Sequence, residues 1–289
     1  MFRSTPPNTR FLAHSTRGYK GSSLFTTEQE SSGQATRDCL GDDLASIIAV
    51  YIESLSLLSH HESSIKLICW SFGGGSVLSA FSLLAQKRLS GRNEKAVYAS
   101  VSEIIFYEPP VNGVLNLQPS PSTIAERAEA AQNNDNPLET FLFGVAGLYD
   151  YPADFLEGIK AGIRDERVFK PRGTLADDAD FRKGAEEIMD AGSMRMYVSS
   201  IPKDEEGEMF VRRSLKAMLE ATGVRRIKVL STLHTLPDCV EGCGVLAARL
   251  RGLERESGVV GKTELCWVEG EYGHFLHVQA PELLWANIL

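Results

Sequence analysis

The chain has 289 residues, of which 43% are hydrophobic and 24% are charged, and its formal net charge is −8. This apolar fraction supports a sizeable core, and the acidic balance argues against a general nucleic-acid binder, which needs a basic face. No run of 18 or more apolar residues occurs, so the sequence predicts no membrane span. The five cysteines form neither a disulfide framework nor a zinc spacing, which favours a reducing, cytoplasmic location and predicts no metal or other cofactor.

The first third of the chain alternates between strand and helix patterns. Short apolar runs indicate strands, and apolar residues at helical spacing indicate the helices between them. In chain order these segments are a strand at 10–14, a helix at 41–58, a strand at 64–70, a helix at 77–85 and a strand at 103–111. Such alternation predicts parallel strands joined by crossover helices.

Strand signals fade between residues 111 and 221, where amphipathic helical patterns predominate. These patterns lie at 124–132, 155–163, 181–189 and 210–219. Strand and helix then alternate again, with strands at 225–231 and 263–269 and helices at 244–253 and 281–289. The sequence thus predicts an α/β core of residues 10–110 and 222–289, into which residues 111–221 are inserted as a helical cap.

One stretch of the first third, "CWSFGG" at 69–74, joins a predicted strand to a predicted helix through a tight turn. Such a turn needs small residues because Cβ atoms would otherwise meet the neighbouring backbone. Its recurring form is G-x-S-x-G, the nucleophile elbow, which holds a serine at the carboxyl edge of a sheet beside a helix N-terminus. Here Cys69 replaces the first glycine, and Ser71 is the candidate nucleophile.

With this elbow the chain resembles the α/β-hydrolase superfamily, and four other segments match that family in the same order. They are "RGYKGSS" at 17–23, "DDLASII" at 42–48, "IIFYEPPV" at 104–111 and "GEYGHFLHVQAPELL" at 270–284. The resemblance covers residues 10–110 and 225–289 and leaves the cap uncovered. It implies an α/β-hydrolase fold, a mostly parallel sheet with a helical cap insertion.

The resemblance also implies roles for single residues. Ser71 matches the family's nucleophile and His274, which directly follows a glycine, matches its general base. In that role His274 removes the proton of Ser71 and later returns it to the leaving group. His277 is the weaker candidate for the base, because it does not follow the glycine.

Two carboxylates are candidates for the acid that partners the histidine. The family usually takes this acid from the loop after the strand expected at 225–231, where Asp238 is the first carboxylate. The G-x-x-D spacing usual in that loop is missing. Some family members place the acid after the earlier strand, where Glu108 stands, although Glu108 could instead be a structural carboxylate beneath the cap. We therefore take Asp238 as the first choice and Glu108 as the alternative.

The oxyanion hole of the family needs two backbone amides, and the one that follows the nucleophile is here that of Phe72. In the family, the other amide comes from a loop after the third strand. The resemblance makes the strand expected at 10–14 the fourth, and this chain begins nine residues before it. The first strands and that loop are therefore expected to be missing from this chain. Three hypotheses follow: an N-terminally truncated chain, a partner that completes the sheet, or a non-catalytic role.

The sequence as a whole predicts a serine hydrolase that cleaves an ester or thioester of a small, mostly apolar substrate through an acyl-enzyme on Ser71. Aromatic residues of the cap suggest the apolar substrate, unless they form only the cap's own core: Phe141, Phe143, Tyr149, Tyr151 and Phe155. The alternatives are a catalytically impaired, hydrolase-like binding protein and an accessory hydrolase of a metabolite biosynthetic pathway. The sequence leaves open whether the chain forms a homo-oligomer.

Overall fold

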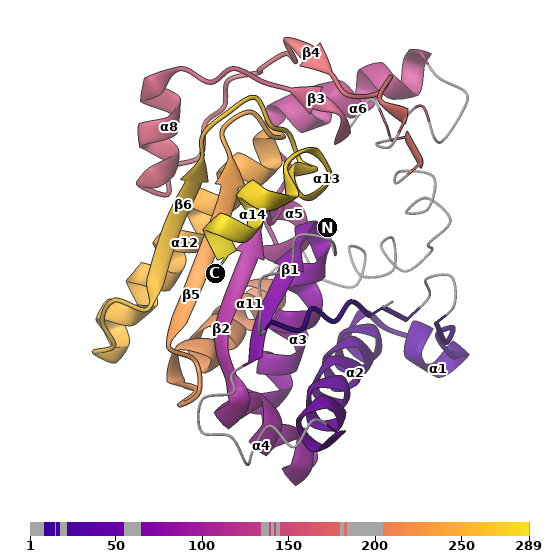
Figure 1. Ribbon diagram of the computed structural model, residues 1–289, viewed down its shortest axis with the longest axis vertical. Helices are drawn as coiled ribbons and strands as arrows, with labels where there is room; N and C mark the ends of the chain where they lie inside the picture. The colour runs from indigo at the N-terminus through magenta and orange to yellow at the C-terminus, as the bar shows by residue number, and fades with distance from the viewer. Residues whose placement is uncertain are drawn as a thin grey trace.

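The computed structural model describes residues 9–14, 16–17, 22–54, 65–133, 139, 142, 145–179, 182–183 and 205–288. A parallel four-stranded sheet in the order β1-β2-β5-β6 forms its centre (Figure 1). The strands are β1 (Ile65–Trp70), β2 (Val101–Tyr107), β5 (Arg226–Thr232) and β6 (Thr263–Val268). The prediction of an α/β fold with parallel strands is therefore confirmed.

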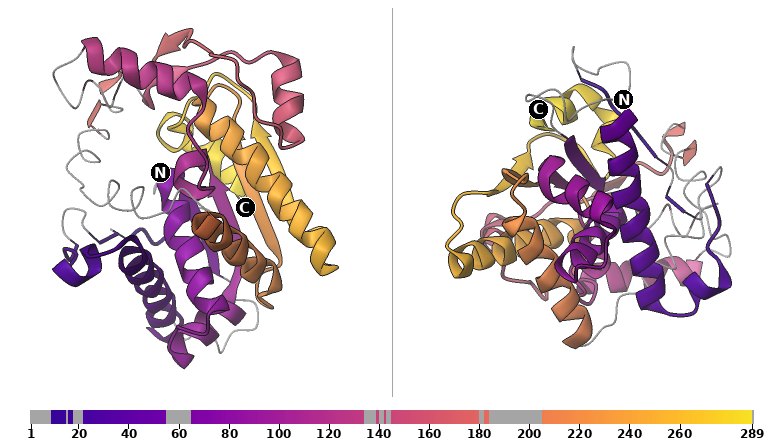
Figure 2. Two further views of the ribbon diagram at one scale, coloured as in Figure 1. Left: turned by 180° about the vertical axis from the view of Figure 1, so that it is seen from behind. Right: turned by 90° about the horizontal axis from the view of Figure 1, so that it is seen from below.

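Helices cover both faces of this sheet (Figures 1 and 2). One face carries α3 (Gly74–Ala85), α11 (Glu205–Glu220) and α12 (Pro237–Ser257), and α2 (Gly33–Ser54) and α4 (Gly91–Ser100) extend this layer beyond α3. The other face carries α13 (Leu276–Gln279) and α14 (Pro281–Ile288). Strand β2 is buried along its whole length because Ile104 and Phe106 enter the core on one face while Ile105 and Tyr107 enter the core on the other.

Charged residues hold α14 against the amino-terminal half of the sheet. Lys66 pairs with the buried Glu103 at 3.1 Å, and Arg226 pairs with the same carboxylate at 2.6 Å. Lys66 and Lys228 also donate to the carbonyl groups of Ile288 and Asn287, at 3.2 and 2.6 Å. Cations are stabilising at the carbonyl end of a helix, so these two lysines fix α14 on the sheet.

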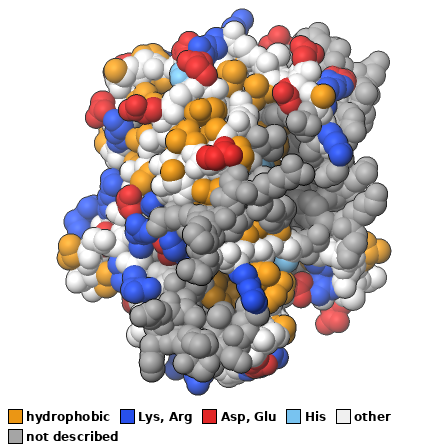
Figure 3. All heavy atoms as spheres, in the orientation of Figure 1, with side chains coloured by type: hydrophobic (Ala, Val, Ile, Leu, Met, Phe, Trp, Pro, Cys, Tyr) orange, Lys and Arg blue, Asp and Glu red, His pale blue; other side chains and the backbone are white. Residues whose placement is uncertain are grey.

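Apolar side chains dominate the other half of the α14 face. Ile105, Leu230, Leu284 and Trp285 belong to one buried cluster, and hydrophobic side chains also gather in the middle of the molecular surface around α13 and α14 (Figure 3). None of the described helices is long and apolar enough to cross a membrane.

Segments between β2 and α11, in the range that the sequence predicts to be a cap, lie toward the carboxyl edge of the sheet (Figure 1). They are α5 (Val111–Val114), α6 (Pro121–Asn133), β3 (Gly147–Leu148), α8 (Ala153–Lys160) and β4 (Gly173–Thr174). Helices α6 and α8 overlap the patterns at 124–132 and 155–163. Most of the pattern at 181–189 lies outside the described residues.

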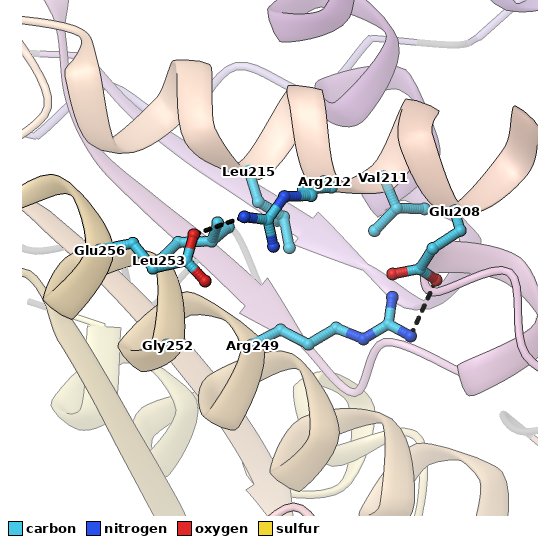
Figure 4. A pocket seen from close by; sticks show the side chains of 8 residues that line it. All are labelled: Glu208, Val211, Arg212, Leu215, Arg249, Gly252, Leu253 and Glu256. Atoms are coloured by element: carbon cyan, nitrogen blue, oxygen red, sulfur yellow. Dashed lines mark hydrogen bonds and ion pairs between the residues drawn. The ribbon is translucent and has the colours of Figure 1, made fainter. Parts of the chain in front are cut away.

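The last helical pattern of the predicted cap lies elsewhere. Helix α11 contains this pattern and packs against α3 in the helical layer of the core, where Phe210 and Leu215 are buried. Two ion pairs, Arg212–Glu256 and Arg249–Glu208, join α11 to α12 across a pocket between the two helices (Figure 4). An amphipathic pattern shows that one face of a helix is buried, but not which neighbour buries it.

Three further elements differ from the prediction. Residues 10–14 are not a strand, and Phe11 packs edge-on against Trp285 with ring centroids 5.4 Å apart. Helix α2 begins at Gly33, eight residues before the predicted start, and follows a short helix, α1 (Thr27–Glu30). Helix α4 was not predicted because only three of its residues are buried, which leaves little apolar periodicity.

Candidate active site

Ser71 stands where β1 ends and the chain turns into α3. The turn is a single 3-10 turn, η3 (Ser71–Gly73), and Ser71 has a φ of 52°, a conformation that non-glycine residues seldom adopt. A Cβ at Gly74, the first residue of α3, would lie 3.0 Å from Val114 and 3.2 Å from the Phe106 ring, so a side chain there would require these neighbours to shift. Cys69, in place of the first glycine of the motif, is buried in the core. The segment therefore has the strand, turn and helix of a nucleophile elbow.

His274 lies within hydrogen-bond distance of Ser71. Its Nε2 is 3.1 Å from the Oγ of Ser71, and only 4% of the residue is exposed. The His274 carbonyl accepts hydrogen bonds from the Trp70 indole at 3.1 Å and from the Tyr107 hydroxyl at 3.4 Å. The last residues of β1 and β2 thus hold the backbone of this histidine in place.

Glu108 completes the arrangement from the end of β2. Its Oε2 lies 2.6 Å from Nδ1 of His274, and the residue is fully buried. The other oxygen, Oε1, accepts from the backbone amide of Thr232 at 3.1 Å and from its hydroxyl at 2.7 Å. Thr235 donates its hydroxyl to Oε2 at 2.9 Å. These bonds satisfy a carboxylate that burial has removed from water.

Asp238, the first choice from the sequence for the acid, does not contact His274 in this way. Its carboxylate accepts a 2.6 Å hydrogen bond from the backbone amide of Ser120, in the loop before α6. The reason lies in the chain path, because Asp238 already belongs to the first turn of α12 while the loop before it brings Thr235 to Glu108. The structure therefore joins His274 to the alternative candidate, Glu108.

His277, the weaker candidate for the base, is packed among aromatic rings. Its ring centroid lies 4.5 Å from that of Trp70 and 6.0 Å from that of Tyr107. Burial, and secondarily the neighbouring His274, lower the pKa of His277 to about 4. His277 is half-buried and its buried Nδ1 has no hydrogen-bond partner among the described residues, whereas Ser71 is bonded to His274.

Sequence reasoning missed three side chains that surround the histidine and the glutamate. Two are Thr232, the last residue of β5, and Thr235 in the loop after it, at the same edge of the sheet as Glu108. The third is Cys239 on α12, whose Sγ lies 3.6 Å from Nδ1 of His274. Burial raises the pKa of the Cys239 thiol well above its ordinary value, so the thiol stays neutral. The sequence signal for the two threonines was their place at the carboxyl end of a buried strand, because parallel strands bring their carboxyl ends together at one edge of the sheet.

The backbone amide of Phe72 follows Ser71 directly, as the sequence predicts for an oxyanion donor. The ring of Phe72 occupies the space beside Gly113, where a Cβ would lie 2.1 Å from it. Within the described part of the chain, no group of three or more His, Cys, Asp or Glu side chains could hold a metal ion.

The structure is thus an α/β protein with a parallel sheet. At the carboxyl edge of that sheet, a serine on a tight turn, a histidine and a glutamate are joined by hydrogen bonds. No family model and no curated protein matches the chain.

Solved structures do show similarity. One is the candidate non-heme bromoperoxidase BpoC of Mycobacterium tuberculosis H37Rv, at 11% identity and a TM-score of 0.40, over 89% of this chain and 73% of that one. E-2-(acetamidomethylene)succinate hydrolase is 12% identical with a TM-score of 0.35, over 94% and 77% of the two chains. A point mutant of esterase E22 has the same identity and TM-score, over 83% and 64%. These likenesses are partial.

Proposed function

We propose that the chain is a serine hydrolase that cleaves an ester or thioester through an acyl-enzyme on Ser71. The observation that carries this proposal is the continuous contact from Ser71 Oγ to His274 Nε2 and from His274 Nδ1 to Glu108 Oε2, at 3.1 and 2.6 Å. A nucleophile, a base and a group that orients the base, each within hydrogen-bond reach of the next, are the requirements for activating a serine.

In the proposed reaction the Oγ of Ser71 attacks the carbonyl carbon while its proton passes to Nε2 of His274. Glu108 stabilises the imidazolium that forms, and the amide of Phe72 donates to the oxygen that becomes negative. His274 then gives the proton to the leaving alcohol or thiol, which departs with the bonding electron pair. Water, activated by His274 in the same manner, hydrolyses the acyl-enzyme and restores Ser71.

The residues on the cap side of the site support a mostly apolar substrate. Trp70, which precedes the serine, and Phe275, which follows the histidine, pack with Leu142 and Leu175 in one cluster. Among the aromatic residues that the sequence indicated, Tyr149, Tyr151 and Phe155 stack on one another at 6.0 and 4.8 Å. Tyr151 and Phe155 belong to a cluster that also includes Val240 of α12 and Trp267 of β6, and Tyr149 is buried beside it. Phe141 and Phe143 lie outside the described residues.

The proposal is tested with a fluorophosphonate probe, followed by peptide mapping of the labelled chain. We expect rapid labelling confined to Ser71 and its loss in Ser71→Ala. Ser76→Ala, a change on the first turns of α3, serves as the matched control and should leave labelling unchanged. A folded wild-type chain that the probe does not label would overturn the hydrolase proposal and favour the alternative of a binding protein without turnover.

A further inference from the structure

The loop between β5 and α12 contributes a side chain that contacts the acid of the proposed mechanism. Thr235, in this loop, donates its hydroxyl to Oε2 of Glu108 at 2.9 Å, and the same oxygen faces Nδ1 of His274 at 2.6 Å. Thr235 is fully buried, as is Glu108. The hydroxyl therefore acts on the very oxygen that pairs with the histidine.

Two consequences follow from this contact. A carboxylate without access to water stays charged only where donors replace its hydration, and a hydroxyl donor stabilises the charged form selectively. A second donor on Oε2 also fixes the direction from which that oxygen faces the imidazole, because Thr232 already holds Oε1. Thr235 thus contributes both to the charge and to the orientation of Glu108.

The cap in turn holds Thr235. The hydroxyl of Tyr151 donates to the Thr235 carbonyl at 2.7 Å. The preceding residue, His234, is bound to the Tyr149 backbone twice: its carbonyl accepts from the Tyr149 amide at 3.1 Å, and its Nδ1 lies 2.6 Å from the Tyr149 carbonyl. The aromatic segment of the cap is thereby hydrogen-bonded to the loop that carries the donor to Glu108.

We propose that Thr235, held by Tyr151 of the cap, is a positioning residue that keeps Glu108 charged and directed at His274. This inference rests on the proposed function and deepens it, since it makes the cap a support of the acid as well as a cover over the site.

Few other groups near Glu108 can titrate in the relevant range. Within the described part of the chain, the groups that face it besides His274 include the thiols of Cys239 and Cys243 on α12 and the phenol of Tyr107 on β2. Burial raises the pKa of all three well above their ordinary values, so they stay neutral up to pH 8. His277 also faces His274, and burial lowers the pKa of His277 to about 4, so it stays neutral above that pH.

The test is the pH dependence of fluorophosphonate labelling at Ser71 in Thr235→Val, with Thr235→Ser as the matched control. Reaction requires a neutral His274 beside a charged Glu108. Without the hydroxyl this charged state is less stable, so the pair takes up its proton at a higher pH. We expect the acidic limb of the labelling rate to move upward by about one pH unit in Thr235→Val and to return in Thr235→Ser. Tyr151→Phe should cause a smaller shift in the same direction.

A second measurement separates this inference from the hydrolase proposal. The titration midpoint of the His274 imidazole, followed by NMR in the same variants, does not depend on whether Ser71 reacts. An upward shift of the midpoint in Thr235→Val supports the positioning role even if the wild-type chain is never labelled. An unchanged midpoint in a Thr235→Val chain that circular dichroism shows to be folded would mean that Thr235 only fills space, and would overturn the inference.

Discussion

Ser71 and Glu108 share an unusual backbone conformation. Each follows the last residue of a strand, and their φ angles are 52° and 50°. Non-glycine residues in this region carry a cost of about 1–3 kcal/mol that the surroundings must offset. Here the two residues lie side by side because Trp70 and Tyr107, which precede them, are partners in the register of β1 and β2. The same backbone turn thus directs both side chains out of neighbouring strands toward His274.

At this scale the two candidate acids can be compared directly. Glu108→Gln keeps the shape of the side chain but cannot stabilise an imidazolium, so the labelling rate of Ser71 should fall about 1,000-fold or more. Asp238→Asn should lower that rate less than tenfold, because Asp238 bonds to Ser120 instead of His274. The measurement is the second-order rate constant for the probe in both variants. A larger loss in Asp238→Asn than in Glu108→Gln would contradict the assignment.

At the scale of elements, α12 lies unusually close to two neighbouring backbones. A Cβ at Gly242 would lie 1.8 Å from the carbonyl oxygen of Pro109, the residue after Glu108. A Cβ at Gly244 would lie 2.0 Å from the carbonyl oxygen of Ile159 on α8. Helix α12 therefore contacts both the end of β2 and α8, and only glycine permits this approach.

We expect two alanine substitutions in α12 to change the free energy of unfolding in opposite directions. Gly242→Ala forces α12 away from Pro109 and should lower the free energy of unfolding by about 3 kcal/mol or more. Gly252→Ala, where the nearest atom to a new Cβ is 4.0 Å away, should raise it by about 0.5–1 kcal/mol through helix propensity. Urea denaturation of both variants measures these changes, and equal stabilities would contradict the close packing of α12.

At the scale of the whole molecule, a buried carboxyl group joins α12 to the segment after α8. Glu241 on α12 is 1% exposed, and Arg164 from the segment after α8 pairs with it at 3.1 Å. Arg164 also donates to the Gln118 carbonyl at 2.8 Å. Burial raises the pKa of Glu241 from 4.5 to about 7, and Arg164 offsets only part of this effect.

The raised pKa gives the stability a definite pH dependence. Between pH 4.5 and 7 the folded chain binds this proton more tightly than the unfolded chain does, so stability falls as pH rises through that window. The Glu241 contribution amounts to about 3 kcal/mol at most. Glu241→Gln should remove it, which unfolding measurements at pH 5, 6, 7 and 8 would show as a smaller difference between pH 5 and pH 8. The same pH dependence in both chains would exclude Glu241 as its source.

The sequence contained enough local information for most of the elements, α4 and residues 10–14 excepted, but not for all of their contacts. β1, the elbow and β2 follow from apolar runs and glycine, and the motif located Ser71 and His274. The choice between Asp238 and Glu108 depends on which strand lies beside β1, and no local pattern states that order. Once β2 is known to pair with β1, the register places Glu108 next to Ser71. The position of α11 on α3 is of the same kind, because a buried face does not identify its neighbour.

The separation of these residues along the chain has a consequence for biosynthesis. Ser71 and Glu108 meet through adjacent strands early in the chain, whereas His274 lies 203 residues after Ser71 and reaches it only by long-range closure. A ribosome-bound chain that contains the serine and the glutamate therefore has no base to activate the serine. If Ser71 is the nucleophile, ester or thioester metabolites therefore cannot acylate it in a nascent chain whose fold is not yet complete. Reactivity toward a fluorophosphonate would then mark fully folded molecules and distinguish them from partly synthesised ones.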